Sequence, residues 1–302
     1  MKMKLASILC VLVFLGVIAT PSILSAQDDD TLYVTGVWAR PTALDSAEAN
    51  PDAVSAAYMT IENAGETTVR LVAAETPAAG LVEIHETTIG EGDVMRMRPV
   101  EDGIVIPPGE RAELRPGGYH IMLLELERDL LPWDAFSMTM RFETLDEAGE
   151  AVGDSFDLTI GVPVLEEAPE PTDFVVLDAW ARHTISEGDV SAVYLRLLNR
   201  GSSDDQLIGA GAPAAGLVEI HETAIGEGDV MRMRPIKALP VAAGEIAALQ
   251  PRGNHIMLIN LERVLEVDDA LLVTLMFESD ALVVIGVPVR DPLAEATPEA
   301  AE

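Results

Sequence analysis

The chain has 302 residues, which is enough for two domains of ordinary size that each bury a core. Its 51 acidic and 19 basic residues give a formal net charge of −32. This charge repels phosphate backbones and anionic lipid head groups, so it argues against nucleic acid and anionic membrane surfaces as partners. The acidic surplus favours solubility and, secondarily, the attraction of cations, including metal ions.

The N-terminal segment has the form of a signal sequence. Two lysines precede an apolar run from Leu5 to Ile18, and Leu24-Ser25-Ala26 is a suitable cleavage site. A retained membrane anchor is the alternative, because the run is only slightly short for a transmembrane helix. The single cysteine, Cys10, lies in this run, so cleavage would leave no disulfide and no thiolate metal site. We expect export to the periplasm or another extracytoplasmic compartment, with no integral membrane span after cleavage.

Short apolar or alternating runs separated by turn residues begin at Thr31, a pattern typical of strands. Turn signals such as Asn63-Ala64-Gly65 and Pro107-Pro108-Gly109 stand between the runs. Many short strands at this spacing predict an all-β fold built as an antiparallel sandwich or barrel. The runs that we expect to be strands in the first half are Leu32 to Trp38, Ala56 to Glu62, Val69 to Ala73, Leu81 to His85, Ile104 to Ile106, Tyr119 to Leu124, Phe136 to Phe142 and Phe156 to Val164.

The second half of the chain repeats the first. The segment LEEAPEPT is a Pro-rich, acidic connector without apolar periodicity, typical of a semi-rigid linker. Beyond it, Trp38-Ala39-Arg40 recurs at Trp180, and the segment IGVPV recurs near the C-terminus, so the chain is a tandem duplication. The predicted division is a signal peptide at 1–26, a first domain at 31–164, the linker at 165–172, a second domain at 173–290 and a disordered acidic tail at 291–302.

One stretch of sequence occurs twice in the chain with almost no change. Pro77 to Pro99 reads PAAGLVEIHETTIGEGDVMRMRP, and Pro213 to Pro235 differs from it at a single position. Each half then carries a Gly-x-His-Ile-Met-Leu motif, beginning at Gly118 and at Gly253. Four of the five histidines and six of the twelve methionines fall in these segments. Imidazole and thioether together form a soft ligand set that suits Cu(I).

Strand alternation places the first histidine of this stretch on a polar face. Val82 and Ile84 share one face, which we expect to be the core face, whereas Glu83 and His85 share the other. A lone histidine is commonly a hydrogen-bonded structural residue, and a lone methionine is ordinarily flexible core filler. The clustering of both residue types, in a chain otherwise short of them, favours a site.

A turn centred near Gly90-Glu91 is expected to fold the following residues back along the first strand. This pairing would set His85 opposite the region of Met95 to Met97, with Cβ atoms about 5 Å apart, close enough for two ligands to share one ion. His120 and Met122 likewise share a strand face. The sequence leaves open whether the strand that carries them lies beside the hairpin.

Each half resembles the periplasmic copper chaperone domain called PCu(A)C, over Thr31 to Val164 and Asp173 to Val289. The resemblance is carried by the histidine, the methionine after a short hairpin and the His-x-Met motif. Trp-Ala-Arg, Met-Arg-Met-Arg-Pro and Pro-Gly-Gly-Tyr-His-x-Met-Leu fit it as well. It implies two cupredoxin-like antiparallel Greek-key sandwich domains that bind Cu(I) through two His and two Met each. It also implies delivery of copper to the dinuclear copper-A centre of cytochrome c oxidase, on subunit II.

The resemblance also implies a ligand set for each domain, carried over position by position. The first implied set is His85, Met97, His120 and Met122. The second implied set is His221, Met233, His255 and Met257. Met95 and Met231 are the alternatives for the hairpin methionine.

We therefore expect a non-enzymatic, exported copper chaperone with one Cu(I) site in each domain. Glu83, Glu86 and Asp93 either assist Cu(II) at an auxiliary site or simply solvate the rim. A blue-copper electron carrier needs a cysteine thiolate, which the mature chain lacks. A metallohydrolase is disfavoured because there is no His-Glu-x-x-His motif or catalytic carboxylate pair. The remaining alternative is a metal-free extracellular β-sandwich module that binds another protein through its Met-rich strand.

Overall fold

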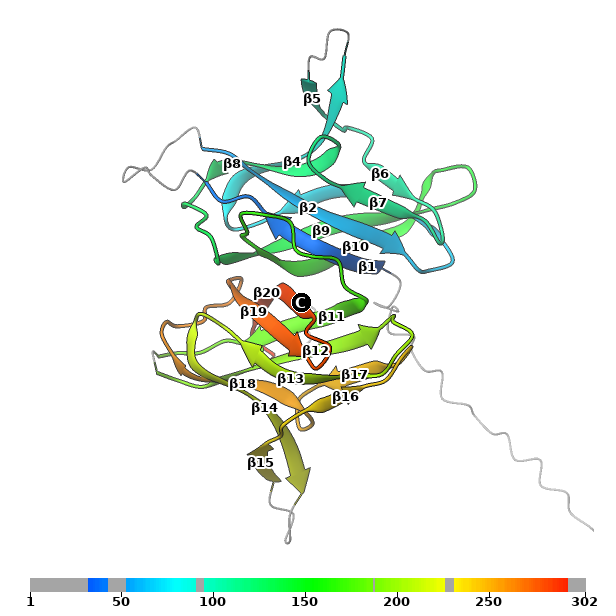
Figure 1. Cartoon of the computed structure of the whole chain (residues 1–302). Helices are drawn as coiled ribbons and strands as arrows, with labels where there is room; N and C mark the ends of the chain where they lie inside the picture. Colours follow the sequence, from blue (N-terminus) through cyan, green and yellow to red (C-terminus); the bar gives the residue numbers. More distant parts are fainter. Residues whose placement is uncertain (1–31, 43–52, 91–94, 187, 226–230, 293–302) are drawn as a thin grey trace, which may run out of the picture.

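The computed structural model describes residues 32–42, 53–90, 95–186, 188–225 and 231–292 (Figure 1). Within these residues every regular element is a β-strand, and the strands form two sandwiches in tandem, which confirms the predicted all-β fold. The predicted signal sequence and most of the acidic tail lie outside the described ranges. No helix in the described part of the chain is long and apolar enough to cross a membrane.

The first sandwich is made of strands β1 to β10. Its two layers enclose one apolar core, to which Met59, Ile121 and Phe142 contribute fully buried side chains. The outer layer follows the order β1 (Leu32–Ala39), β2 (Ser55–Asn63), β7 (Arg111–Leu114), β8 (Tyr119–Leu126), β4 (Ala79–Ile89) and β5 (Met95–Pro99). The inner layer contains β3 (Thr68–Glu75), β6 (Ile104–Ile106), β9 (Ala135–Leu145) and β10 (Ala151–Pro163).

The second sandwich repeats this arrangement with strands β11 to β20 around a core of its own. Its outer layer contains β11 (Phe174–Arg182), β12 (Ser191–Asn199), β17 (Ile246–Leu249), β18 (His255–Leu261), β14 (Ala215–Ile225) and β15 (Met231–Pro235). Its inner layer contains β13 (Asp205–Gly211), β16 (Leu239–Val241), β19 (Ala270–Phe277) and β20 (Leu282–Arg290).

The two inner layers meet at a pair of glycines that occupy the same place in the repeat. β10 and β20 pair antiparallel through Gly161 and Gly286, which joins the two inner layers. Because β20 also pairs with β11, the connected sheet of 14 strands includes the outer layer of the second sandwich as well. A Cβ atom on Gly161 would lie 2.2 Å from the carbonyl carbon of Gly286, and one on Gly286 would lie 2.5 Å from that of Gly161. The two backbones therefore approach so closely that only glycine fits at either position.

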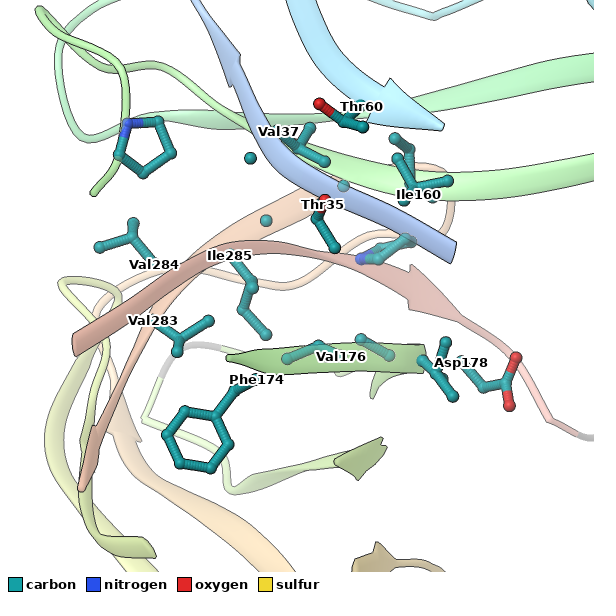
Figure 2. A pocket seen from close by; sticks show the side chains of 18 of the residues that line it. Thr35, Val37, Thr60, Ile160, Phe174, Val176, Asp178, Val283, Val284 and Ile285 are labelled. Atoms are coloured by element: carbon teal, nitrogen blue, oxygen red, sulfur yellow. The ribbon is translucent and has the colours of Figure 1, made fainter. Parts of the chain in front are cut away.

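Apolar side chains from both halves pack beside this crossing. One buried cluster combines Trp38, Tyr58 and Leu165 with Ala270 and Leu272. A cavity of about 500 Å³ also lies between the sandwiches, where residues of β1 and β10 face residues of β11 and β20 (Figure 2). None of the histidines and methionines of the repeated stretch lines this cavity.

The crossing leaves the two repeated hairpins far apart. β5 and β15 lie at opposite ends of the molecule, each projecting away from the contact between the sandwiches (Figure 1). Met122 of the first predicted site, by contrast, packs against the buried cluster between the sandwiches.

We predict that Gly161→Ala loosens the contact between the sandwiches, because the added Cβ atom overlaps the backbone of Gly286. Hydrogen exchange should speed up at the backbone amides around the crossing in β10 and β20, while the core strands of each sandwich keep their protection. Gly211→Ala is the matched control, since a Cβ atom there has no heavy atom within 4 Å. Equal exchange in the two variants would show that the glycine crossing does not hold the sandwiches together.

Candidate metal centre

The sandwich places the two histidines of the first repeat directly beside each other. β8 pairs antiparallel with β4, which sets His120 opposite His85 and Met122 opposite Glu83. Directly paired residues point to the same face of a sheet. The imidazole rings of His85 and His120 lie edge to face, with their centroids 5.8 Å apart. This face is the outer one, because Ile84 and Ile121 point from the same strands into the core.

The register of the hairpin differs from the one expected from the sequence. The expectation that the segment Met95 to Met97 lies directly opposite His85 is wrong, because Pro99 occupies that position. Met97 pairs with Thr87, and Met95 pairs with Ile89. Because Ile89 pairs with Met95, the pairing is displaced from one centred near Gly90-Glu91, which moves every pair along the strand.

Met97 nevertheless stays on the histidine face. It is a diagonal neighbour of His85, and such neighbours lie about 7–8 Å apart, within reach of a long side chain. Met95 lies two residues farther along β5, so it is the more distant of the two methionines. Both side chains are exposed, Met97 at 60% and Met95 at 69% of their surface.

The second repeat has the same register. His221 pairs with His255, and Glu219 pairs with Met257. Met233 lies opposite Thr223 on β14. The imidazole centroids of His221 and His255 are again 5.8 Å apart. The structure therefore brings the two histidines and the strand methionine together in each domain, with the hairpin methionine on the same face but farther out.

Hydrogen bonds fix one nitrogen of each imidazole and leave the other free. Nδ1 of His120 lies 3.0 Å from the carbonyl oxygen of Gly118, a bond in which the ring N–H donates. Nε2 of His120 then carries the lone pair. Nε2 of His85 lies 2.9 Å from a carboxylate oxygen of Glu83. Its Nδ1 is buried and has no hydrogen-bond partner among the described residues.

The second domain repeats these bonds. Nδ1 of His255 lies 3.1 Å from the carbonyl oxygen of Gly253, and Nε2 of His221 lies 2.9 Å from Glu219. Nδ1 of His221 is also buried without a partner in the part of the chain that the structure describes. A buried nitrogen left without a partner is costly, and a bound cation is one way to satisfy it. The residues of each site therefore fit a metal ion that accepts two imidazole lone pairs.

Burial lowers the pKa of one histidine in each pair. Desolvation lowers the pKa of His120, an effect that its hydrogen bond to Gly118 opposes and the neighbouring His85 reinforces. Desolvation likewise lowers the pKa of His255, again against the bond to Gly253 and with help from His221. A neutral imidazole can bind a metal ion without first losing a proton.

Aromatic rings continue the row of histidines across the sheet. Trp38 pairs with Tyr58 across β1 and β2, with ring centroids 4.8 Å apart, and Tyr58 lies 6.3 Å from His120. The guanidinium of Arg40 lies 5.5 Å from the Tyr58 ring centre. Burial raises the pKa of Tyr58, although Arg40 opposes the shift. Trp38 and Tyr58 thus lie on one side of the site, and both belong to the buried cluster between the sandwiches.

The acidic residues near the first site are already engaged. Glu83 accepts a hydrogen bond from His85, and Glu86 pairs with Arg98 at 2.9 Å on the opposite face. Asp93 lies outside the described residues. No group of three or more His, Cys, Asp or Glu side chains in the described ranges is arranged to hold a metal ion. The described residues therefore offer no separate oxygen-rich site for a harder cation.

The fold and the paired histidines define a two-domain β-sandwich protein with one candidate soft-metal site in each domain. The family model described as "Putative lipoprotein LpqE-like" matches residues 32–152 and again residues 174–289. The chain belongs to this LpqE-like family, and each half of the duplication is matched separately.

One curated relative and two solved structures illustrate what the chain is similar to. It is 36% identical over 89 residues to "Putative lipoprotein Lxx21020" of Leifsonia xyli, a match that spans 30% of this chain and 53% of that relative. The copper-bound PCuAC domain from PmoF2 is 21% identical, with 41% of this chain and 97% of that one covered and a TM-score of 0.35. Cu(I)-bound DR1885 of Deinococcus radiodurans is 26% identical, with 39% and 80% covered and a TM-score of 0.31.

We predict that the metal-free protein loses stability as the pH falls below about 6.5, the ordinary imidazole pKa in the unfolded chain. Because burial lowers the pKa of His120 and His255 in the folded state, the unfolded state takes up protons first. Stability from these groups is present above pH 6.5 and is lost as the pH falls toward their lower folded values. Urea unfolding at neutral and mildly acidic pH measures the change. A His120→Asn/His255→Asn variant should show a weaker pH dependence of stability. If the variant loses as much stability at low pH as the original protein, these two histidines are not the cause.

Proposed function

We propose that the protein is a copper chaperone that holds one Cu(I) ion in each domain. The observation that carries the proposal is the cross-strand pairing of two imidazoles, each with one ring nitrogen outside its hydrogen bond, beside a methionine. Imidazole and thioether ligands without thiolate match the preference of Cu(I) for soft donors. The proposed ligands are His85, Met97, His120 and Met122 in the first domain and His221, Met233, His255 and Met257 in the second.

The hairpin methionine is the proposed exchangeable ligand. Met97 and Met233 are each 60% exposed, whereas His120 and His255 are buried. Met has an unbranched, flexible side chain that adapts its position readily. A site with one buried imidazole, one partly buried imidazole and an exposed thioether can take up a copper ion from one side and release it on that side.

The same exposure supports transfer to another protein. Each hairpin projects from one end of the molecule (Figure 1), so a partner can reach the exposed Met97 or Met233 without separating the sandwiches. His and Met ligands hold Cu(I) less firmly than thiolates, so the ion can pass to an acceptor that offers thiolates. The resemblance to the copper chaperone domain makes the copper-A centre of cytochrome c oxidase subunit II the proposed acceptor. The location that we propose is outside the cytoplasm, after cleavage of the signal sequence at residues 1–26.

Titration of the purified protein with Cu(I), in the presence of a competing chromogenic chelator, should give two bound equivalents. His120→Ala with Met122→Ala should reduce this to one, because the second domain keeps its own ligands. The corresponding change at His255 and Met257 should also leave one equivalent, and the combined variant none. One or no equivalent in the unaltered protein would contradict the proposal and favour a metal-free protein-binding module.

Replacement of the two hairpin methionines should distinguish their roles. Because Met97 is diagonal to His85 and Met95 lies two residues farther away, Met97→Ala should weaken Cu(I) binding about tenfold in the first domain. Met95→Ala should leave it within about twofold. The chelator competition assay measures both, in a protein whose second site has been removed at His255 and Met257. A larger loss from Met95→Ala would move the ligand assignment to Met95.

A further inference from the structure

Each proposed site contains a carboxylate whose place the ligand set does not explain. Glu83 stands two residues before His85 on β4 and points to the same outer face, directly opposite Met122. Glu219 has the same relation to His221 and Met257 on β14. Both carboxylates are partly exposed, at 36% and 34% of their side-chain surface, so burial does not account for their position. Both lie 2.9 Å from Nε2 of the neighbouring histidine.

This contact determines the tautomer of the histidine. An ionised carboxylate can accept a hydrogen bond but cannot donate one. In the bond between His85 and Glu83, the proton must therefore be on Nε2 of His85. In a neutral ring the lone pair is then on Nδ1. That nitrogen is the one that the structure leaves buried and without a partner in the described residues, and the same holds for His221. The hydrogen bond at Nε2 and the unpartnered Nδ1 both indicate the same tautomer, in which Nε2 carries the proton and Nδ1 the lone pair.

The two histidines of a site use opposite nitrogens. His120 and His255 donate through Nδ1 to a backbone carbonyl oxygen, which leaves Nε2 free. His85 and His221 donate through Nε2 to a carboxylate, which leaves Nδ1 free. An acceptor bonded to the far nitrogen of a metal-binding imidazole fixes the orientation of the ring and raises its basicity. A carboxylate does so more strongly than a carbonyl oxygen, because the bond is assisted by charge.

We infer that Glu83 and Glu219 are positioning residues, which hold His85 and His221 as Nε2–H tautomers and present Nδ1 to the copper ion. The inference rests on the proposed function for the identity of the ion. Each glutamate also places a negative charge beside a site whose proposed ligands, two imidazoles and two thioethers, carry no negative charge. This charge offsets the single positive charge of Cu(I) without placing a hard oxygen ligand on a soft ion.

The chain supplies a matched control on the same strand. Glu86 is one residue beyond His85, and it points to the opposite face, where it pairs with Arg98. Glu222 has the same relation to Arg234 in the second domain. Changing these glutamates removes the same charge from the same strands without touching an imidazole.

Two measurements on the full protein test the inference. Long-range ¹H–¹⁵N correlation spectra of the metal-free protein, recorded near pH 8, report which ring nitrogen carries the proton. We expect Nε2–H for His85 and His221, and a mixture of tautomers in the Glu83→Ala/Glu219→Ala variant. Chelator competition should show Cu(I) bound 10–100-fold more weakly by that variant.

The conservative and control variants complete the test. Glu83→Gln/Glu219→Gln should restore the tautomer, because its amide oxygen still accepts the bond, and should recover part of the affinity. Glu86→Ala/Glu222→Ala should change neither readout. Nδ1–H histidines in the unaltered protein, or full affinity in the double alanine variant, would overturn the inference.

The two readouts separate this inference from the proposed function. The tautomers are measured without metal, so Nδ1–H histidines in a protein that binds two Cu(I) ions overturn only the positioning role. Nε2–H histidines in a protein that binds no Cu(I) overturn the proposed function, and with it the role of the glutamates at a copper site.

Discussion

The pairing of β4 with β8, repeated as β14 with β18, is the constraint on which each site depends. It sets His85 against His120 and His221 against His255, although about 35 residues separate the partners in each pair. Because paired residues share a sheet face, the methionine two positions farther along β8 or β18 is brought to the same surface. A one-residue change in this register would turn the histidines into the core and remove the site.

The duplication adds a second constraint where the two sandwiches meet. Gly161 and Gly286 allow the inner layers to meet backbone to backbone, and apolar side chains from both halves pack beside them. The hairpins β5 and β15 project away from this contact (Figure 1), whereas Met122 packs against the buried cluster between the sandwiches. Joining the domains this way gives the chain two candidate sites, the first of which borders the contact between the sandwiches.

Much of this arrangement follows from the sequence through the period of two along a strand. The alternation in Leu81 to His85 correctly places Ile84 in the core and His85 on the other face. The alternation does not predict the register of the hairpin, because register depends on the length of the connection between the strands. The sequence between Ile89 and Met95 contains two glycines, and nothing in its order distinguishes a pairing centred near Gly90-Glu91 from the register in which Ile89 pairs with Met95. The neighbour of β4 depends on the topology of the whole sandwich, so the position of His120 could be taken only from a family resemblance.

X-ray absorption spectroscopy of the Cu(I)-loaded protein tests the central claim most directly, because it reports which elements are bonded to the copper. The account predicts a first shell that contains both imidazole nitrogen and thioether sulfur, with the sulfur contribution reduced when Met122 and Met257 are replaced. A first shell of nitrogen and oxygen alone would contradict it, since the outer faces would then hold copper without the methionines that the strand pairing brings beside the histidines.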